Sequence, residues 1–392
     1  MKIRVIIRSS EIQDCYIPNM SIIFPPLNRF LIDLAHFSVS CIITIPCFLH
    51  LLRKNSGREM RKLGISPLAA VLSLAIVVAL TAIITPQGCD AAGIVARSIY
   101  VNQRKPADFR SVQKAIDSIP WGNKQWIRIH VAAGVYFEKV NVPLNKSFIL
   151  LEGEGKDQTF IEWGDHADGK TNTASSPTFA SYATDFMARD ITFKNTYYGV
   201  RDMAPAVAAL VAGDRSSFHR CGFISVQDTL SDLAGRHYYH KCYIEGAMDF
   251  IFGNARSIFE ECEVTTGKTP VSPGYITAQG RDSEKEDTGF VFKRCKLGGV
   301  TPTYLGRAWR AYARVIFYKT DMSSVVVSQG WDAWNYDGKE STLTMVESEC
   351  TGQGSNRTGR MPWGKAVHPK QIARFLSLSY VSADGWLDAQ PR

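Results

Sequence analysis

A short pattern, an aromatic residue followed three positions later by cysteine, occurs four times in the second half of the chain. The cysteines are Cys221, Cys242, Cys262 and Cys295, so the spacings are 21, 20 and 33 residues. A period of roughly 20–25 residues in β-rich sequence is typical of a solenoid, in which each coil stacks on the previous one and equivalent side chains align. The repeat therefore predicts an all-β chain folded as a parallel β-helix; a β-sandwich with coincidental spacing is the alternative.

Short apolar runs separated by Gly, Asn and Asp agree with this reading. Strands are expected in the segments 127–131, 147–151, 159–163, 186–193 and 206–211. One short helix is expected from Phe109 to Ile119, where apolar residues recur at a spacing of three to four before Pro120. The spacing of 33 predicts one coil enlarged by a loop at 265–272 or 282–288.

The first 92 residues differ in character from the rest. Two uncharged apolar stretches span 34–52 and 63–85, and Met60-Arg61-Lys62 precedes the second. A positive start, an apolar stretch and the small residues that end at Ala92 predict a signal peptide at 60–92. Residues 1–59 are then an N-terminal extension of doubtful status, although two membrane segments are an alternative. The catalytic domain is expected at 93–392, outside the cytoplasm.

Charge and cysteine content narrow the function further. The net charge of +8 is mild and forms no basic arm, so a nucleic-acid partner is not expected. Five cysteines follow residue 92 without a metal-ligand spacing, so no zinc site is expected. Because five is odd, at least one thiol is free; Cys262 with Cys295 is the preferred disulfide. Asn145 and Asn356 begin glycosylation sequons.

Two aspartates stand out against the repeat. Asp228 and Asp249 are 21 residues apart, which equals one coil, so their backbones should lie about 4.8 Å apart on neighbouring coils. Two carboxyl groups that close cannot both ionise easily, so one should hold a proton while the other is a carboxylate. Such a pair suits a nucleophile beside a general acid. Two solvated turn aspartates are the alternative, but Leu230 and the run 250–252 are apolar.

The segment Leu305-Gly306-Arg307-Ala308-Trp309 supplies two further candidates. Arg307 can pair in a bidentate manner with Asp249, which would hold that carboxylate ionised and oriented. Trp309 can stack on the face of a sugar. A surface arginine and a core tryptophan remain the alternative.

Several strings, in order, carry a family resemblance. They are QDTL (227–230), GRHYY (235–239), DFIFGNA (249–255), YITAQGR (275–281) and LGRAW (305–309), with GVYFEKV (134–140), ARDITFKNT (188–196) and GWDAW (330–334) in agreement. This set resembles the plant pectin methylesterases (pectinesterases), in the form without an N-terminal inhibitor-like domain.

The resemblance implies a right-handed parallel β-helix with the short N-terminal helix as its cap. It implies a carboxylic ester hydrolase that acts in cell wall modification and converts methyl esters of homogalacturonan (pectin) to carboxylates and methanol without metal or cofactor. The protein would be secreted to the extracellular cell wall as a monomeric glycoprotein. A proteinaceous pectinesterase inhibitor is a further partner that the resemblance suggests.

The resemblance also assigns roles. Asp249 matches the nucleophile, and Asp228 matches the general acid that later acts as base. Gln227 matches an oxyanion donor, and Arg307 matches the partner of the nucleophile. Aromatic positions that line the sugar cleft are matched by Phe252, Trp309 and Trp331.

Three positions depart from the family pattern. Pro205 stands where a second oxyanion glutamine is common, Ser231 replaces an aromatic residue after QDTL, and Ala308 replaces proline in LGRPW. Loss of one oxyanion donor costs on the order of 10²–10³ in rate. A pectin-binding β-helix protein with weak or no esterase activity is therefore the main alternative function. A glycosidase or lyase on the same scaffold is the other.

Overall fold

The computed structural model describes residues 5–6, 22–23, 93–198 and 203–392. Strands β1 (Val5–Ile6) and β2 (Ile22–Ile23) pair in parallel within a unit that spans Met1–Gln87, and a second compact unit spans Gly88–Arg392. The expected extension at 1–59, those two strands apart, and the expected signal peptide or membrane segments up to residue 92 lie outside the described residues. No helix in the described segments is long and apolar enough to cross a membrane.

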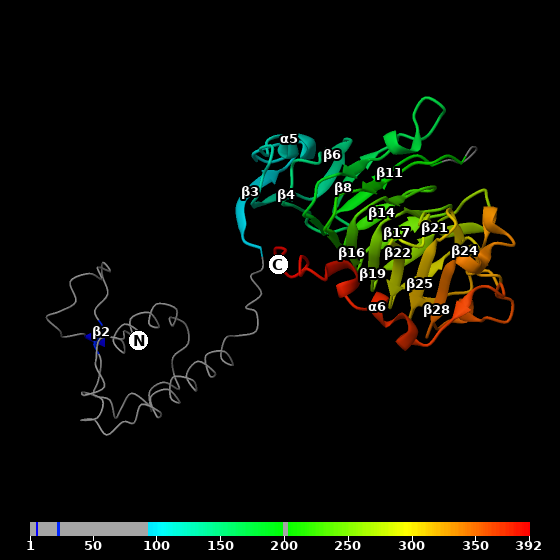
Figure 1. Ribbon diagram of the computed structural model, residues 1–392. Helices are drawn as coiled ribbons and strands as arrows, with labels where there is room; N and C mark the ends of the chain where they lie inside the picture. Colours follow the sequence, from blue (N-terminus) through cyan, green and yellow to red (C-terminus); the bar gives the residue numbers. More distant parts are fainter. Residues whose placement is uncertain (1–4, 7–21, 24–92, 199–202) are drawn as a thin grey trace, which may run out of the picture. The chain divides into compact units, whose positions relative to one another are not determined.

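The larger unit is built from three parallel sheets whose strands follow one another in a coil (Figure 1). Every pairing in the three sheets joins parallel strands of successive coils in sequence order, which confirms the parallel β-helix.

The first sheet contains, in chain order, β3 (Val95–Val101), β4 (Trp126–Val131), β7 (Ile149–Glu152), β10 (Phe186–Arg189), β13 (Ser216–His219), β16 (Arg236–His240), β19 (Arg256–Glu260), β22 (Gly289–Lys293), β25 (Arg314–Tyr318), β28 (Thr344–Ser348) and β29 (Lys365–Ala366). The second contains β5 (Gly134–Phe137), β8 (Thr159–Trp163), β11 (Thr192–Asn195), β14 (Gly222–Ile224), β17 (Tyr243–Gly246), β20 (Glu263–Thr266), β23 (Lys296–Gly299) and β26 (Asp321–Met322). The third contains β6 (Val140–Val142), β9 (Phe179–Ser181), β12 (Ala209–Val211), β15 (Leu230–Asp232), β18 (Ile251–Gly253), β21 (Gly274–Gln279), β24 (Thr303–Ala308) and β27 (Trp331–Asp332).

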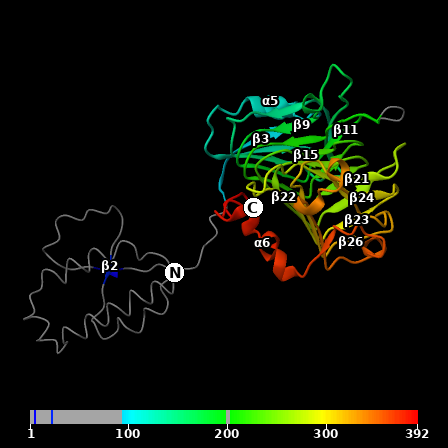
Figure 2. The same ribbon diagram turned by 45° about the vertical axis from the view of Figure 1, so that its right-hand side comes forward.

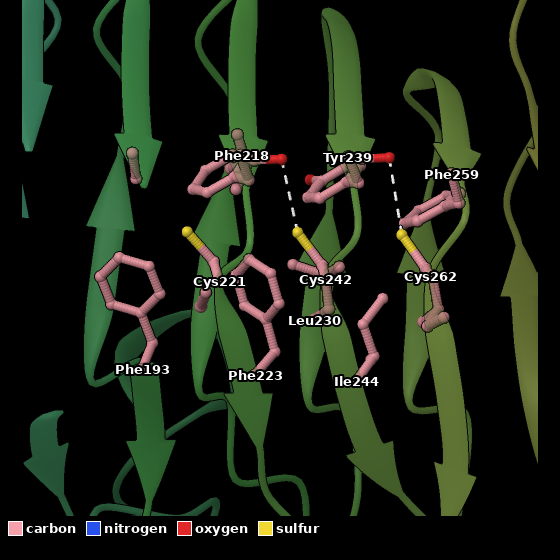
Figure 3. Close-up of a cluster of buried hydrophobic side chains, with 14 of the residues drawn as sticks. Phe193, Phe218, Cys221, Phe223, Leu230, Tyr239, Cys242, Ile244, Phe259 and Cys262 are labelled. Atoms are coloured by element: carbon pink, nitrogen blue, oxygen red, sulfur yellow. Dashed lines mark hydrogen bonds between the residues drawn. The ribbon is translucent and has the colours of Figure 1, made fainter. Parts of the chain in front are cut away.

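The aromatic residues of the repeat form a column through the core (Figure 3). Phe218 pairs with Tyr239, and Phe259 follows on the next coil and Phe292 on the one after. Successive ring centroids lie 5.1, 4.5 and 4.6 Å apart, with the rings nearly parallel. The spacings of 21, 20 and 33 residues therefore each correspond to one coil. Stacking of this kind adds to the free energy of burying each ring.

Single residues with positive φ turn the chain from the first sheet into the second. Arg220, Lys241, Glu261 and Arg294 all have φ between 52° and 55°, and each directly precedes a cysteine of the repeat. The left-handed conformation reverses the strand direction within one residue. Asp190 makes the same bend at φ 57°. The expected strand at 186–193 is therefore two strands, β10 and β11, in different sheets.

The cysteines of the repeat are free, so the expected Cys262–Cys295 disulfide is wrong. Their thiols instead donate to carbonyl oxygens on the preceding coil, Cys262 to Tyr239 (3.5 Å) and Cys295 to Phe259 (3.3 Å) (Figure 3 shows the first of these). Both side chains are buried, and they fill the corner beneath the bend. Free cysteine commonly behaves in this way as a small buried apolar residue.

The loops that enlarge the third sheet account for the spacing of 33. Between Cys242 and Cys262 the links around the third-sheet strand are short, at 247–250 and 254–255. In the next coil they become 267–273 and 280–288, and β21 is longer than β18. Both predicted insertion sites contribute, and both lie beside the third sheet.

Short helices cover the ends and one outer face. Helix α5 (Val112–Asp117) packs on β3, β4 and β6, and its N-terminus is capped by the Ser111 side chain and the Glu138 carboxylate. It lies at the predicted place, although it is shorter than predicted. Helices α6 (Ala373–Leu376) and α7 (Ser379–Ser382) pack on the outer face of the first sheet (Figure 2). The 3-10 turns are η2 (Thr173–Ser175), η3 (Trp334–Tyr336), η4 (Glu340–Thr342), η5 (Gln353–Ser355) and η6 (Pro369–Ile372).

Candidate active site

The third sheet carries the candidate residues, and the alternation of its strands sorts them into two rows. The core row faces the interior and consists of Ala209, Leu230, Ile251, Thr277, Gly306 and Trp331. The surface row points to the opposite side and consists of Leu210, Ser231, Phe252, Ala278, Arg307 and Asp332. Because successive strand residues point to opposite faces, a shift of one position moves a side chain from one row to the other.

Asp228 and Asp249 occupy equivalent positions on neighbouring coils. Gln227 pairs with Met248 in an isolated parallel bridge, and the Asp228 amide donates to the Met248 carbonyl at 3.0 Å. The predicted offset of 21 residues is therefore the observed register. Both aspartates bend the chain between the second and third sheets, with φ of 61° and 47°. Aspartate tolerates this left-handed conformation better than most residues, and such backbone positions cluster at functional sites.

Asp228 is held as an acid. Burial, and then the negative charge of Asp249, raise the pKa of Asp228 from 3.8 to about 8, while the charge of Arg307 opposes this shift. Within the part of the chain that the structure describes, no side chain donates a hydrogen bond to its carboxyl group. At neutral pH this aspartate therefore carries a proton that it can donate.

Asp249 differs because Arg307 binds it directly. The Arg307 Nε donates to Asp249 Oδ1 at 2.8 Å, and Nη2 donates to Oδ2, which makes the pair bidentate. Burial raises the pKa of Asp249, the hydrogen bonds and charge of Arg307 lower it, and the negative charge of Asp332 raises it again. The two aspartates thus have different environments, which is the arrangement expected for an acid beside a nucleophile.

Arg307 is itself enclosed by aromatic rings. Its guanidinium carbon lies 4.4 Å from the ring centroid of Tyr275 and 3.7 Å from that of Trp334. The Tyr275 hydroxyl donates to Asp332 Oδ2 at 2.6 Å, and the Trp334 amide donates to Asp332 Oδ1 at 2.7 Å. The sequence analysis missed all three residues as site residues. Tyr275 lies in YITAQGR, and Asp332 and Trp334 lie in GWDAW, so the motifs contained them, but no spacing rule placed them around Arg307.

The three predicted sugar-binding aromatics divide. Phe252 and Trp309 are half-buried near each other, with ring centroids 6.0 Å apart in a T-shaped arrangement. Trp331 is only 1% exposed, and its indole N–H donates to Glu347 at 3.1 Å. Its predicted place in a sugar cleft is therefore wrong, because it belongs to the core row. Trp334, three positions later, is 36% exposed and lies over Arg307.

Two glycines of the motifs make this packing possible. A Cβ on Gly306 would lie 2.0 Å from Thr277 Oγ1, so only glycine fits in the core row beside Arg307. Gly253 has φ 126°, and a Cβ there would lie 2.1 Å from the Asp232 carbonyl oxygen. Glycine permits both the unusual dihedral and the close approach of the backbone.

Gln227 lies beside Asp228, and its side chain has no hydrogen-bond partner among the described residues. Its backbone carbonyl accepts from the amide of Ala206 at 3.0 Å. Pro205 directly precedes Ala206, so it lies near Gln227 on the adjoining coil and offers no donor there.

The comparison with known proteins adds an independent finding. The family model described as Pectinesterase matches residues 98–384. The chain belongs to the pectinesterase family. It is a carboxylic ester hydrolase by this membership, and the residues matched cover nearly the whole β-helix.

Individual relatives agree with the family match. The chain is 42% identical over 309 residues to "Probable pectinesterase 29" of Arabidopsis thaliana, covering 76% of this chain and 91% of that one. It is 36% identical over 303 residues to "Pectinesterase QRT1" of the same plant, with 75% and 79% covered. Among solved structures, pectin methylesterase from carrot matches with a TM-score of 0.71 at 32% identity, over 76% of this chain and 97% of that one.

Proposed function

We propose that this pectinesterase hydrolyses the methyl esters of homogalacturonan in pectin, giving free carboxylates and methanol, with Asp249 as nucleophile and Asp228 as general acid and base. The observation that carries the proposal is the pair of coil-related aspartates, one tied to Arg307 and the other protonated by its surroundings. Family membership supports the reaction class.

In the first half of the reaction, an oxygen of the ionised Asp249 attacks the ester carbonyl carbon. Arg307 holds that carboxylate in a fixed orientation through two hydrogen bonds, so little reorganisation is needed for attack. When the tetrahedral intermediate collapses, the bond from carbon to the methoxy oxygen breaks. Asp228 gives its proton to that oxygen, and methanol leaves, with the galacturonate acyl group bound to Asp249.

In the second half, Asp228 is a carboxylate and acts as a base. It takes a proton from water as the water oxygen attacks the acyl carbon, and the bond to Asp249 breaks. Asp228 is then protonated again and Asp249 is again a carboxylate, so the site returns to its starting state.

Gln227 is placed to donate its side-chain N–H to the developing oxyanion, since it adjoins Asp228 and its amide has no partner among the described residues. Phe252, Trp309 and Trp334 offer partly exposed aromatic faces near the aspartates, and such faces suit sugar rings. Arg307 serves the nucleophile.

A second function, pectin binding with weak or no turnover, is favoured by one observation. Pro205 removes the side-chain donor expected beside Gln227, and the loss of one such donor costs on the order of 10²–10³ in rate. The aromatic surface would remain available for binding without fast chemistry.

Methanol release and chain cleavage should be measured on highly methylated pectin with the wild type and Asp249→Asn. We expect methanol from the wild type, no shortening of the chains, and loss of methanol in the variant. Asp190→Asn is a matched control, because Asp190 bends the chain in the same left-handed conformation far from the site and pairs with Arg220. Chain cleavage without methanol would refute the esterase. Binding without turnover would establish the second function.

We further propose that the protein acts as a secreted monomer in the extracellular cell wall and can bind a proteinaceous pectinesterase inhibitor. The location of pectin and the apolar segment that ends before residue 92 support secretion. N-terminal sequencing of the exported protein, and size-exclusion chromatography with and without an inhibitor, test these points. An intracellular protein that retains residue 1 would contradict secretion.

A further inference from the structure

We infer that Asp332 is a positioning residue for the reaction: it fixes Tyr275 and Trp334 around the guanidinium of Arg307 and so keeps Arg307 aligned on the nucleophile Asp249. The inference rests on the proposed function and extends it to residues outside the aspartate pair. Asp332 is argued to act through its neighbours and to make no contact with the reacting atoms.

The hydrogen bonds of Asp332 carry the first step of the argument. Its Oδ2 accepts from the Tyr275 hydroxyl at 2.6 Å, and its Oδ1 accepts from the Trp334 backbone amide at 2.7 Å. One carboxylate therefore holds two separate segments, β21 and the turn that begins η3. Hydrogen bonds to a charged group are stronger than neutral ones, so both segments are held firmly.

The rings held in this way contact Arg307. The guanidinium carbon lies 4.4 Å from the Tyr275 ring centroid and 3.7 Å from the Trp334 ring centroid. Planar guanidinium groups stack favourably on aromatic faces, which restricts their rotation. The two rings therefore limit Arg307 to the orientation in which Nε and Nη2 meet the two oxygens of Asp249.

The absence of a direct ion pair makes this division of roles clear. Asp332 and Arg307 are register partners on the neighbouring strands β27 and β24, in the surface row. Even so, no hydrogen bond or ion pair joins their side chains in the described part of the chain. If Asp332 bound Arg307 directly, it would compete with Asp249 for the guanidinium. Tyr275 and Trp334 occupy its acceptor oxygens instead.

Charge provides a second, measurable consequence. The charged and titratable groups that face Asp249 are Arg307, Asp332 and Asp228. The negative charge of Asp332 disfavours ionisation of Asp249, so its removal should favour the ionised nucleophile. The acid limb of the rate profile, where activity rises as Asp249 ionises, should therefore move to lower pH in Asp332→Asn.

The test compares methanol release by the wild type, Asp332→Asn, Asp332→Ala and Tyr275→Phe from about pH 4 to pH 9. We expect Asp332→Ala to lower kcat by about 10- to 100-fold, since displaced catalytic groups cost rates of this size. Tyr275→Phe keeps the ring and loses the link, so kcat should fall with KM nearly unchanged. The double variant Tyr275→Phe/Asp332→Ala should lose little beyond Asp332→Ala alone, because both changes break one assembly.

Asp337→Asn is the matched control, because Asp337 is an exposed aspartate in the same segment. It should leave kcat and the acid limb unchanged. An unchanged acid limb in Asp332→Asn, or full additivity in the double variant, would overturn the inference while the wild type still releases methanol. A wild type without methanol release would instead mean that the proposed function fails, and the two failures are thus distinguishable.

Discussion

Replacement of Asp228 by asparagine should stabilise the protein while it abolishes turnover. In the folded chain burial and Asp249 raise the pKa of Asp228 from 3.8 to about 8. Between these two values the folded state binds a proton that the unfolded state lacks, so stability falls as pH rises through this window. Asparagine is neutral at every pH and accepts the same left-handed backbone, so it removes this cost without a new strain.

The size of the effect follows from the shift. Each pKa unit corresponds to about 1.4 kcal/mol, so the cost of Asp228 is up to about 2 kcal/mol at pH 5 and about 4 kcal/mol at pH 7. Asp228→Asn should recover most of it. For a domain of this size, 1 kcal/mol moves the thermal midpoint by roughly 2 °C, so the midpoint should rise by about 8 °C at pH 7.

Scanning calorimetry of both proteins at pH 5, 6, 7 and 8, at one scan rate, measures the difference. The gain should grow with pH and level off near pH 8. Asp190→Asn is the control: Asp190 has the same backbone conformation, and its side chain pairs with Arg220 near the surface. Its loss should be neutral or slightly destabilising. A gain that does not change with pH, or a variant less stable than the wild type at pH 8, would refute the reasoning about the acid.

Three further outcomes are expected. The value of kcat/KM should fall above about pH 8, when Asp228 loses the proton for methanol, and a profile flat to pH 10 would contradict this. Asp232→Ala should cost about 3–5 kcal/mol in denaturant unfolding, because it would remove the buried acceptor of His237, Tyr239 and Ser257; a loss below 1 kcal/mol would contradict a shared network. Alkylation with iodoacetamide should modify Cys262 and Cys295 only after unfolding, without prior reduction, and a requirement for reductant would indicate a disulfide.

The repeat in the sequence was sufficient for the coil and for the aspartate pair. Parallel strands of successive coils align equivalent residues, so a spacing of 21 places Asp228 beside Asp249 as surely as Phe218 beside Tyr239. The segment LGRAW indicated Arg307 for a similar reason, because an arginine near a buried carboxylate forms a bidentate pair.

The tertiary structure decided what the repeat could not specify, which is the side to which each residue points. In the motif GWDAW the sequence favoured Trp331 as a sugar-binding residue, but the register of β24 and β27 turns Trp331 into the core. Trp334 lies over Arg307 because the chain turns after β27. A shift of one residue in a strand exchanges the two faces, and a short motif does not fix that phase.

The surroundings of Arg307 show the same limit. Tyr275 and Asp332 lie 57 residues apart and meet only because their strands flank β24 in the third sheet. The free thiols also depended on side-chain direction, since stacked cysteines can turn toward carbonyl groups instead of toward each other. By itself the sequence determined the coil and the two aspartates, because a regular period aligns equivalent residues. The tertiary structure alone decided which side chains complete the site, because that depends on strand phase and on contacts between distant coils.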